Sequence, residues 1–161
     1  MILRDYQHQA IKDARAQIRA GRKRIIIHSG TGTGKTVIAA EITKSALKNG
    51  KHVLFLAHRK ELIDQALAKL AAFGVEAGVL MASDPRRKPW LPVCVASVPT
   101  LARRQNKPRA DLIVLDECHH ARADTYTRIL DEYPAAVVLG LTATPVRSDA
   151  RGLGDLFESM V

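Results

Sequence analysis

The sequence predicts an α/β protein with a mostly parallel central sheet and helices on both faces. Short apolar runs rich in β-branched residues recur along the chain, as in RIIIH (24–28) and DLIVLDE (111–117). Amphipathic stretches alternate with these runs, as in residues 60–73. Strands that are apolar throughout and joined by helices form parallel sheets buried on both sides. We therefore expect one layered domain spanning residues 1–161.

Local patterns place each element in chain order. The first helix is expected over 5–20, with Asp5 as its N-cap and Gly21 as its stop, because apolar residues recur there every three or four positions. Further helices are expected over 36–49, 60–73, 99–104 and 124–133. Strands are expected over 24–28, 52–58, 76–81, 93–97, 111–117 and 135–144. Three prolines make residues 84–92 a loop.

Length and composition suit a single domain. The chain has 161 residues, of which 47% are hydrophobic and 25% charged. No stretch approaches the roughly 20 apolar residues of a membrane span, and the first residues lack the pattern of a signal peptide, so we expect a cytoplasmic protein. Cys94 and Cys118 belong to no CxxC pair, which predicts reduced thiols rather than a zinc site.

The net charge favours a polyanionic partner. Lysine and arginine number 25 against 16 acids, giving +9 at pH 7 and a pI of about 9.9. Clustered cations gain affinity for phosphates through counterion release. Charge alone leaves open the alternative of a soluble protein that is merely basic.

Five polar segments follow expected strands, and ligands of parallel sheets bind at the carboxyl ends of strands. The segments are SGTGTGKT, AHRKE, SVPTL, DECHH and TATP. We therefore expect all five at one edge of the sheet, where they would form a single functional site.

SGTGTGKT (29–36) predicts a phosphate-binding loop for ATP and Mg²⁺. Gly34, Lys35 and Thr36 fit the pattern G-x-x-x-x-G-K-[ST], while Ser29 stands at the first glycine position. The alternating glycines let backbone N–H groups point inward, and the following helix adds its positive end. Lys35 would contact the β- and γ-phosphates, and Thr36 would ligate Mg²⁺.

An acid pair emerges at the end of the expected strand 111–117. We assign Asp116 to the metal and Glu117 to orienting and deprotonating the attacking water. A helix N-cap is the alternative for an isolated acid pair. The presence of Lys35 and Thr36 favours the catalytic interpretation.

Together these motifs resemble the first RecA-like domain of superfamily 2 helicases, the DEAD/DEAH-box group in its broad sense. The resemblance runs from LRDYQHQA to LTATPVR and implies a RecA-like P-loop NTPase fold. It implies that Gln7 reads adenine, with Arg4 and Tyr6 beside it. It implies that the whole loop contacts the nucleotide: Ser29, Gly30, Thr31, Gly32, Thr33, Gly34, Lys35 and Thr36.

Other motifs of the same resemblance concern coupling and nucleic acid. His119 in DECH, together with Thr142 and Thr144 in TAT, would couple the nucleotide state to nucleic-acid contact. Two further segments would grip the nucleic-acid backbone without reading sequence, through His58, Arg59, Ser97 and Thr100. The residues of these motifs are most similar to those of bacterial DNA-repair members, the RadD-like branch, which favours DNA over RNA. Restriction-enzyme motors have similar motifs.

Basic residues flank SVPTL on both sides. We hypothesise that part of this surface continues the nucleic-acid track; a solvated basic loop is the alternative. The residues concerned are Arg86, Arg87, Lys88, Arg103, Arg104, Lys107 and Arg109. Aromatic residues make up only 4% of the chain, which favours backbone binding over base stacking.

The resemblance also implies a second RecA-like domain that supplies arginines to the γ-phosphate. No such domain fits in this sequence, so we expect a lobe that binds ATP and Mg²⁺, hydrolyses ATP slowly and unwinds nothing alone. Three alternatives remain: a nucleic-acid-binding module with nucleotide as a conformational switch, the DNA-translocase lobe of a restriction enzyme, and a P-loop switch acting on protein partners.

Overall fold

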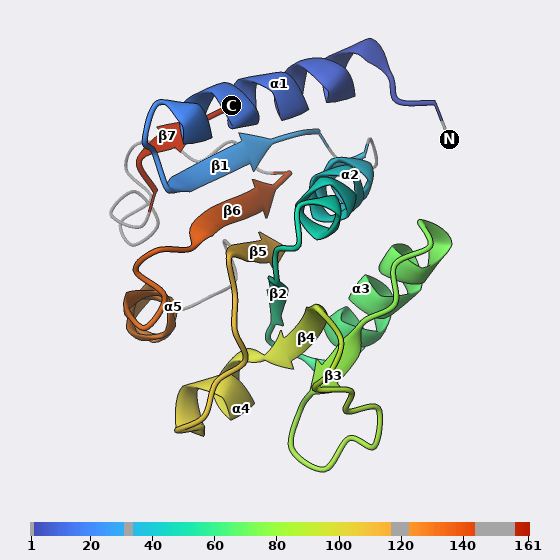
Figure 1. Cartoon of the computed structure of the whole chain (residues 1–161), viewed down its shortest axis with the longest axis vertical. Helices are drawn as coiled ribbons and strands as arrows, with labels where there is room; N and C mark the ends of the chain where they lie inside the picture. The colour runs from blue at the N-terminus through green and yellow to red at the C-terminus, as the bar shows by residue number, and fades with distance from the viewer. Residues whose placement is uncertain (1, 31–33, 117–122, 144–156) are drawn as a thin grey trace.

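A computed structural model describes residues 2–30, 34–116, 123–143 and 157–161. Within these residues, five helices pack on one seven-stranded sheet in which every strand pair is parallel (Figure 1). The helices are α1 (Asp5–Arg19), α2 (Lys35–Lys48), α3 (Lys60–Ala72), α4 (Val98–Arg103) and α5 (Ala123–Asp131). The strands are β1 (Arg24–His28), β2 (Val53–Ala57), β3 (Gly78–Leu80), β4 (Val93–Ser97), β5 (Leu112–Asp116), β6 (Val137–Thr142) and β7 (Ser159–Met160). The predicted fold class is confirmed.

The sheet has the strand order β3-β4-β2-β5-β6-β1-β7 and buries both of its faces. Alternate residues of a strand point to opposite sides, so Phe55 packs with α1, α2 and α3, while Leu54 and Leu56 pack with α4 and α5. Because both faces are covered, polar groups of the strands are confined to their ends. No helix among the described residues is long and apolar enough to cross a membrane.

The start of α1 differs from the prediction. Arg4, not Asp5, is the N-cap residue, because its backbone is extended (φ −77°, ψ 155°) whereas Asp5 already lies in the first turn. The Arg4 N–H donates a hydrogen bond of 2.9 Å to Oε1 of Gln7. A side chain three residues into the helix therefore caps it in place of the expected aspartate.

Strand β7 has no counterpart among the predicted elements. It pairs with β1 through the registers Ile25↔Ser159 and Ile26↔Met160, and Val161 N–H donates to Ile26 O at 2.8 Å. Two residues are too few to show the alternation that identifies a strand in a sequence. The strand forms because β1 would otherwise expose an unpaired edge.

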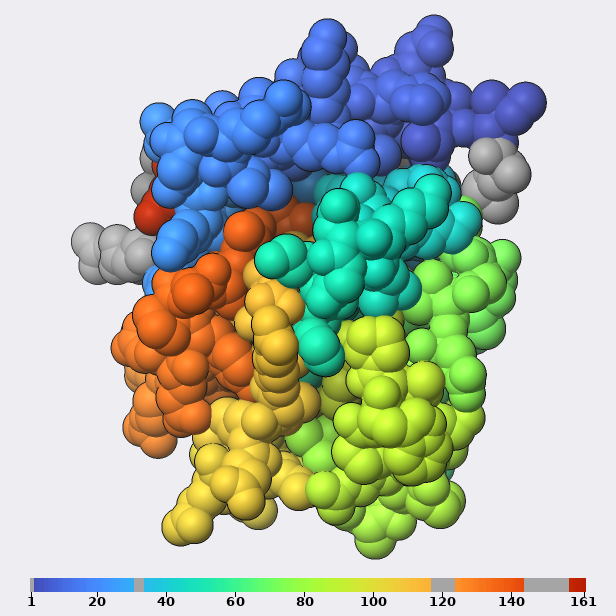
Figure 2. All heavy atoms as spheres, in the orientation of Figure 1, coloured from blue at the N-terminus to red at the C-terminus, as the bar shows by residue number. Residues whose placement is uncertain are grey.

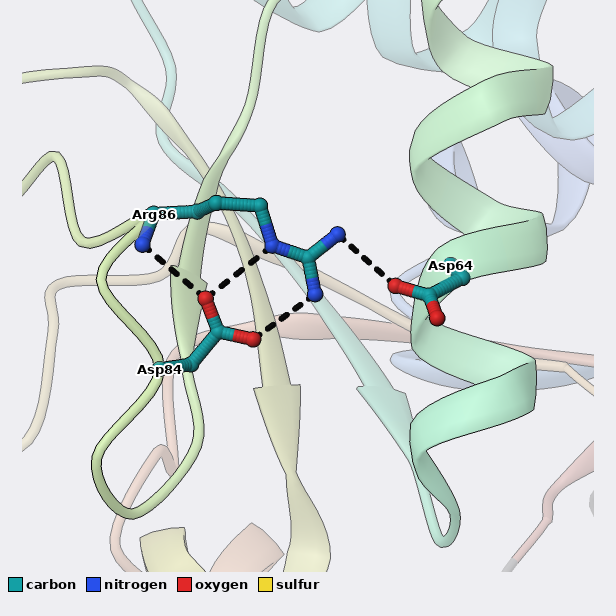
Figure 3. A network of polar contacts seen from close by, with 3 residues as sticks. All are labelled: Asp64, Asp84 and Arg86. Carbon is teal, nitrogen blue, oxygen red and sulfur yellow. Dashed lines mark hydrogen bonds and ion pairs between the residues drawn. The ribbon is translucent and has the colours of Figure 1, made fainter.

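The loop between β3 and β4 is fastened to α3 by Arg86 (Figure 3). Its guanidinium lies 2.7 Å from Asp84 Oδ2 and 2.7 Å from Asp64 Oδ1, and the Arg86 N–H also donates to Asp84 Oδ1. The Asp84 side chain is only 5% exposed. Hydrogen bonds from Arg86 lower the pKa of Asp84 to about 2.

We predict that this network contributes stability that depends on acid pH. The folded pKa of Asp84 lies below its ordinary value of 3.8, so the contribution is full above pH 3.8 and disappears as pH falls through about 2. Asp84→Asn should lower the unfolding midpoint by a few degrees at pH 7 and differ little from wild type at pH 2. Thermal unfolding across this range tests the expectation. Asp131→Asn, which removes an exposed ion pair with Arg24, is the control and should change the midpoint little at either pH.

Candidate functional site

The carboxyl ends of three adjacent strands bring the main motifs together. Parallel register aligns Asp116 of β5 with Leu141 of β6, and His28 of β1 with Thr142 of β6. The N–H of Ser29 then donates to Thr142 O at 3.2 Å. The predicted acid, the buried Thr142 and the start of the glycine loop are therefore neighbours on one edge.

The phosphate loop ends where α2 begins. Gly34 is the N-cap of α2 with φ +117° and ψ 18°, a conformation that side chains rarely tolerate. Lys35 and Thr36 occupy the first turn of α2, and the N–H groups and dipole at a helix N-terminus attract anions. The end of the predicted loop that the structure describes is therefore a helix N-terminus of the kind that binds anions. Within the loop, Gly30 is exposed.

Gln7 packs directly against the end of this loop. Its side chain is 5% exposed, and a Cβ added at Gly34 would overlap the Gln7 side-chain nitrogen. The same side chain caps α1 through the Arg4 N–H. The structure thus joins two predicted nucleotide-binding segments, while Arg4 and Tyr6 lie exposed beside them.

The two predicted magnesium ligands meet in one cavity. Thr36 and Asp116 both line a cavity of about 20 Å³ between α2, α3 and the sheet, which is room for roughly one water-sized species. A hydroxyl and a carboxylate are oxygen ligands of the kind that Mg²⁺ prefers. The other described residues that line it are Lys69 and six apolar residues, so Thr36 and Asp116 are the two oxygen ligands that this cavity offers a magnesium ion.

Lys69 of α3 is a member of this site that the sequence analysis missed. Its Nζ lies 3.9 Å from Asp116 Oδ2, and it lines the same cavity. Nothing in the amphipathic pattern of α3 distinguishes Lys69 from the helix's other polar residues. This cation therefore offsets part of the negative charge of the Asp116 carboxylate.

Several predicted site residues lie outside the described part of the chain. They are Thr31, Gly32, Thr33, Glu117, His119 and Thr144. The assignments of Glu117 to the attacking water and of His119 and Thr144 to coupling stay predictions.

The predicted nucleic-acid contacts occupy the ends of β2 and β4, which pair through Ala57↔Ser97. Arg59 is exposed as the N-cap of α3. The ring of His58 packs edge-on against Tyr126, with centroids 5.6 Å apart, and its Nε2 atom is buried. Arg59 is therefore better placed than His58 to reach a ligand outside the protein.

Ser97 and Thr100 frame the start of α4. Ser97 is its N-cap and is 5% exposed. Thr100 Oγ1 accepts a 3.1 Å hydrogen bond from the Ala82 N–H, in the turn that follows β3. The Thr100 hydroxyl therefore holds a neighbouring loop at this edge, and its own proton can still be donated to a ligand.

Five of the seven basic residues that flank SVPTL lie away from this edge, which corrects the sequence hypothesis for those five. Helix α4 follows the carboxyl end of β4, and the chain then returns to the amino ends of β2 and β5, where Asp111 N–H donates to His52 O at 2.8 Å. Five of the basic side chains line a hollow there: Arg87, Lys88, Arg104, Lys107 and Arg109. Arg86 is engaged by Asp64 and Asp84 instead.

Comparison with known proteins agrees with the motifs. The model of the family described as "Type III restriction enzyme, res subunit" matches residues 1–147. A Saccharomyces cerevisiae protein named as an ATP-dependent helicase, IRC3, is 35% identical over 178 residues, covering 99% of this chain and 26% of the relative. The Escherichia coli type I restriction enzyme EcoAI endonuclease subunit is 33% identical over 171 residues, covering 96% of this chain and 21% of the relative.

Solved structures agree on the fold. The UvsW helicase of bacteriophage T4 superposes with a TM-score of 0.83 at 17% identity, covering 100% of this chain and 60% of that chain. The chain spans about a quarter of the length of the curated relatives it matches.

We predict that Gly34→Ala prevents nucleotide binding. The new methyl group meets the Gln7 amide and forces a left-handed backbone on alanine. Binding of a fluorescent ATP analogue should weaken by more than about tenfold.

Gly50→Ala is the matched control, because Gly50 also has a positive φ (+69°) but has nothing within 4 Å of the added Cβ. It should cost about 1 kcal/mol of stability and leave nucleotide affinity unchanged. Equal affinities for the two variants would show that the contact between Gln7 and Gly34 is irrelevant to binding.

Proposed function

This chain belongs to the family described as type III restriction enzyme, res subunit, and on that premise we propose that it is the ATP-binding lobe of a nucleic-acid-dependent ATPase. The observation that carries the proposal is the cavity shared by Thr36 and Asp116 at the start of α2. It combines an anion-binding helix end with two oxygen ligands for a divalent cation.

Each residue at this edge has a distinct role in the proposal. Lys35 binds the β- and γ-phosphates, and Thr36 and Asp116 hold Mg²⁺, which neutralises charge on the phosphates when bound. Gln7 reads the adenine edge, with Arg4 and Tyr6 beside it. Glu117 accepts a proton from the attacking water.

Coupling between nucleotide and nucleic acid is proposed to run through β6. Thr142 is fully buried, and its carbonyl accepts from the N–H of Ser29 in the phosphate loop. The next strand, β5, carries Asp116 in register with Leu141. A shift of the phosphate loop would therefore move β6 and, through it, the acid pair Asp116 and Glu117. His119 and Thr144 are proposed to complete the coupling.

The nucleic-acid partner is proposed to lie along the ends of β2 and β4. Arg59 supplies an exposed cation, and Ser97 and Thr100 supply hydroxyls, all suited to backbone phosphates. DNA is favoured over RNA, because one relative is a restriction endonuclease subunit.

A second candidate function is the DNA-translocase lobe of a restriction enzyme. The family match favours it directly. The two candidates share the ATP site and differ in whether the strands separate. The complete protein would translocate on duplex DNA without unwinding it if the second candidate is correct.

A second RecA-like domain is proposed to complete the enzyme. It would supply arginines to the γ-phosphate, and such arginines contribute about 10³–10⁵ in rate in related phosphoryl-transfer enzymes. The lobe by itself is therefore proposed to bind ATP·Mg²⁺ and to hydrolyse it slowly.

We predict that ATP binds to the 161-residue chain and turns over slowly, with Glu117→Gln removing the residual turnover while leaving binding intact. Steady-state hydrolysis, with and without single- and double-stranded DNA and RNA, measures this. Lys35→Ala should weaken binding more than about tenfold. Unchanged ATP affinity in Lys35→Ala would contradict the proposed site. Unaltered ATP turnover in Glu117→Gln would favour the alternative in which nucleotide acts only as a conformational switch, because an ATPase needs that carboxylate for turnover.

We predict that Arg59→Gln weakens nucleic-acid binding equally for all sequences. Loss of one phosphate contact should reduce the slope of log K against log salt by about 1. Lys12→Gln is the control, because Lys12 is an exposed cation on α1. Fluorescence anisotropy over a salt series checks both. Identical slopes of log K against log salt for Arg59→Gln and Lys12→Gln would show that Arg59 does not contact a nucleic-acid phosphate.

A further inference from the structure

A hollow of about 360 Å³ opens at the amino ends of β2, β3 and β4, away from the nucleotide edge. Its walls come from two loops, 86–92 and 104–109, with His52 before β2 and Pro92 before β4. Figure 2 shows the two loops at the lower end of the molecule, while α1 lies at the upper end. The volume is within the range of about 300–1,000 Å³ typical of small-ligand sites.

Two arginines in the hollow have guanidinium groups available for a ligand. The other three cations face acids: Lys88 pairs with Glu76, Lys107 with Glu132 at 2.9 Å, and Arg109 lies 3.8 Å from Asp111. Arg87 and Arg104 form no ion pair with any of the described residues. Arg104 makes a 3.4 Å hydrogen bond from Nε to the Asn106 carbonyl.

The floor of the hollow is apolar and uncharged. Val79, Leu80, Leu91 and Cys94 line it together with prolines. Burial raises the pKa of the Cys94 thiol to about 11, although Arg104 and Arg87 oppose the shift, so the thiol is neutral at pH 7. None of the described residues that line the hollow is acidic, and Glu76, Glu132 and Asp111 face its other three cations. An anion can therefore bind beside Arg87 or Arg104 while an apolar group rests on the floor.

Trp90 lies in the chain between Pro89 and Leu91, which both line the hollow. The residue is 74% exposed, so its ring is accessible to a ligand. Aromatic faces next to arginines bind single-stranded nucleic acid by stacking on bases.

We propose that this hollow is a second nucleic-acid site, which holds a backbone phosphate of a single strand with Arg87 and Arg104 and a base on Trp90. A single guanidinium can donate two parallel hydrogen bonds to phosphate oxygens, so each of the two arginines that line the hollow is suited to a backbone phosphate. The site lies apart from the carboxyl ends of the strands, where the proposed nucleotide site is, and does not depend on the proposed ATPase activity. It would keep a single strand bound while the proposed nucleic-acid contacts at the carboxyl ends of β2 and β4 are released and formed again.

Trp90 provides a direct test because it is the one tryptophan in the sequence. Its emission, excited at 295 nm, is followed while oligothymidylate is added to the full chain. The expected result is a saturable change in emission. Arg87→Gln with Arg104→Gln should weaken the apparent affinity by at least about tenfold. Lys12→Gln with Lys48→Gln, which removes the same charge from exposed positions on α1 and α2, should leave it within about twofold of wild type.

Three results would overturn the proposal: an unresponsive Trp90, equal affinities for the two double variants, or an equal response to hexaglutamate, which would indicate an acidic peptide site. Circular dichroism confirms that each variant is folded, and Arg87→Lys with Arg104→Lys, which keeps the charge, should restore only part of the affinity. Failure of ATP binding with an intact Trp90 response would contradict the ATPase proposal alone. The Trp90 response should survive Arg59→Gln.

Discussion

The parallel pairing of β5, β6 and β1 is the constraint on which the rest of the structure depends. Both faces of the sheet are covered by helices, so these strands are apolar along their length and can carry polar groups only at their ends. Parallel register then sets Asp116, Thr142 and Ser29 side by side at one edge. The site's geometry is thus a consequence of how the core is packed, and substitutions that shift β6 within the sheet would move both the loop and the acid.

Two contacts connect this group of residues at the strand ends to the helices. Gln7 connects the first turn of α1 to Gly34, so the helix that covers β1 also limits the shape of the phosphate loop. Lys69 connects α3 to Asp116. Arg59 is the N-cap of α3, so this one helix contacts Asp116 and also reaches the proposed nucleic-acid edge.

The sequence predicted what local patterns determine. Apolar runs located β1 through β6 to within a few residues, and the intervening helices predicted that most strands run parallel. Features that depend on long-range contacts could not be predicted from the sequence. Strand β7 is too short to recognise, and Lys69 does not differ in pattern from other surface lysines. The cap of α1 is formed by Gln7 and not by Asp5. Five of the basic residues beside SVPTL were misplaced, because sequence proximity does not reveal that the segments before β4 and after α4 lie at the amino ends of the strands.

Thr36 and Asp116 are proposed to hold a divalent ion together with nucleotide. The most direct measurement is the affinity for an ATP analogue with Mg²⁺ and with EDTA, in wild type and in Asp116→Asn. The account predicts that EDTA weakens binding by about tenfold or more in wild type and changes it little in Asp116→Asn. An equal dependence on Mg²⁺ in both proteins would contradict it, because the ion would then be held elsewhere.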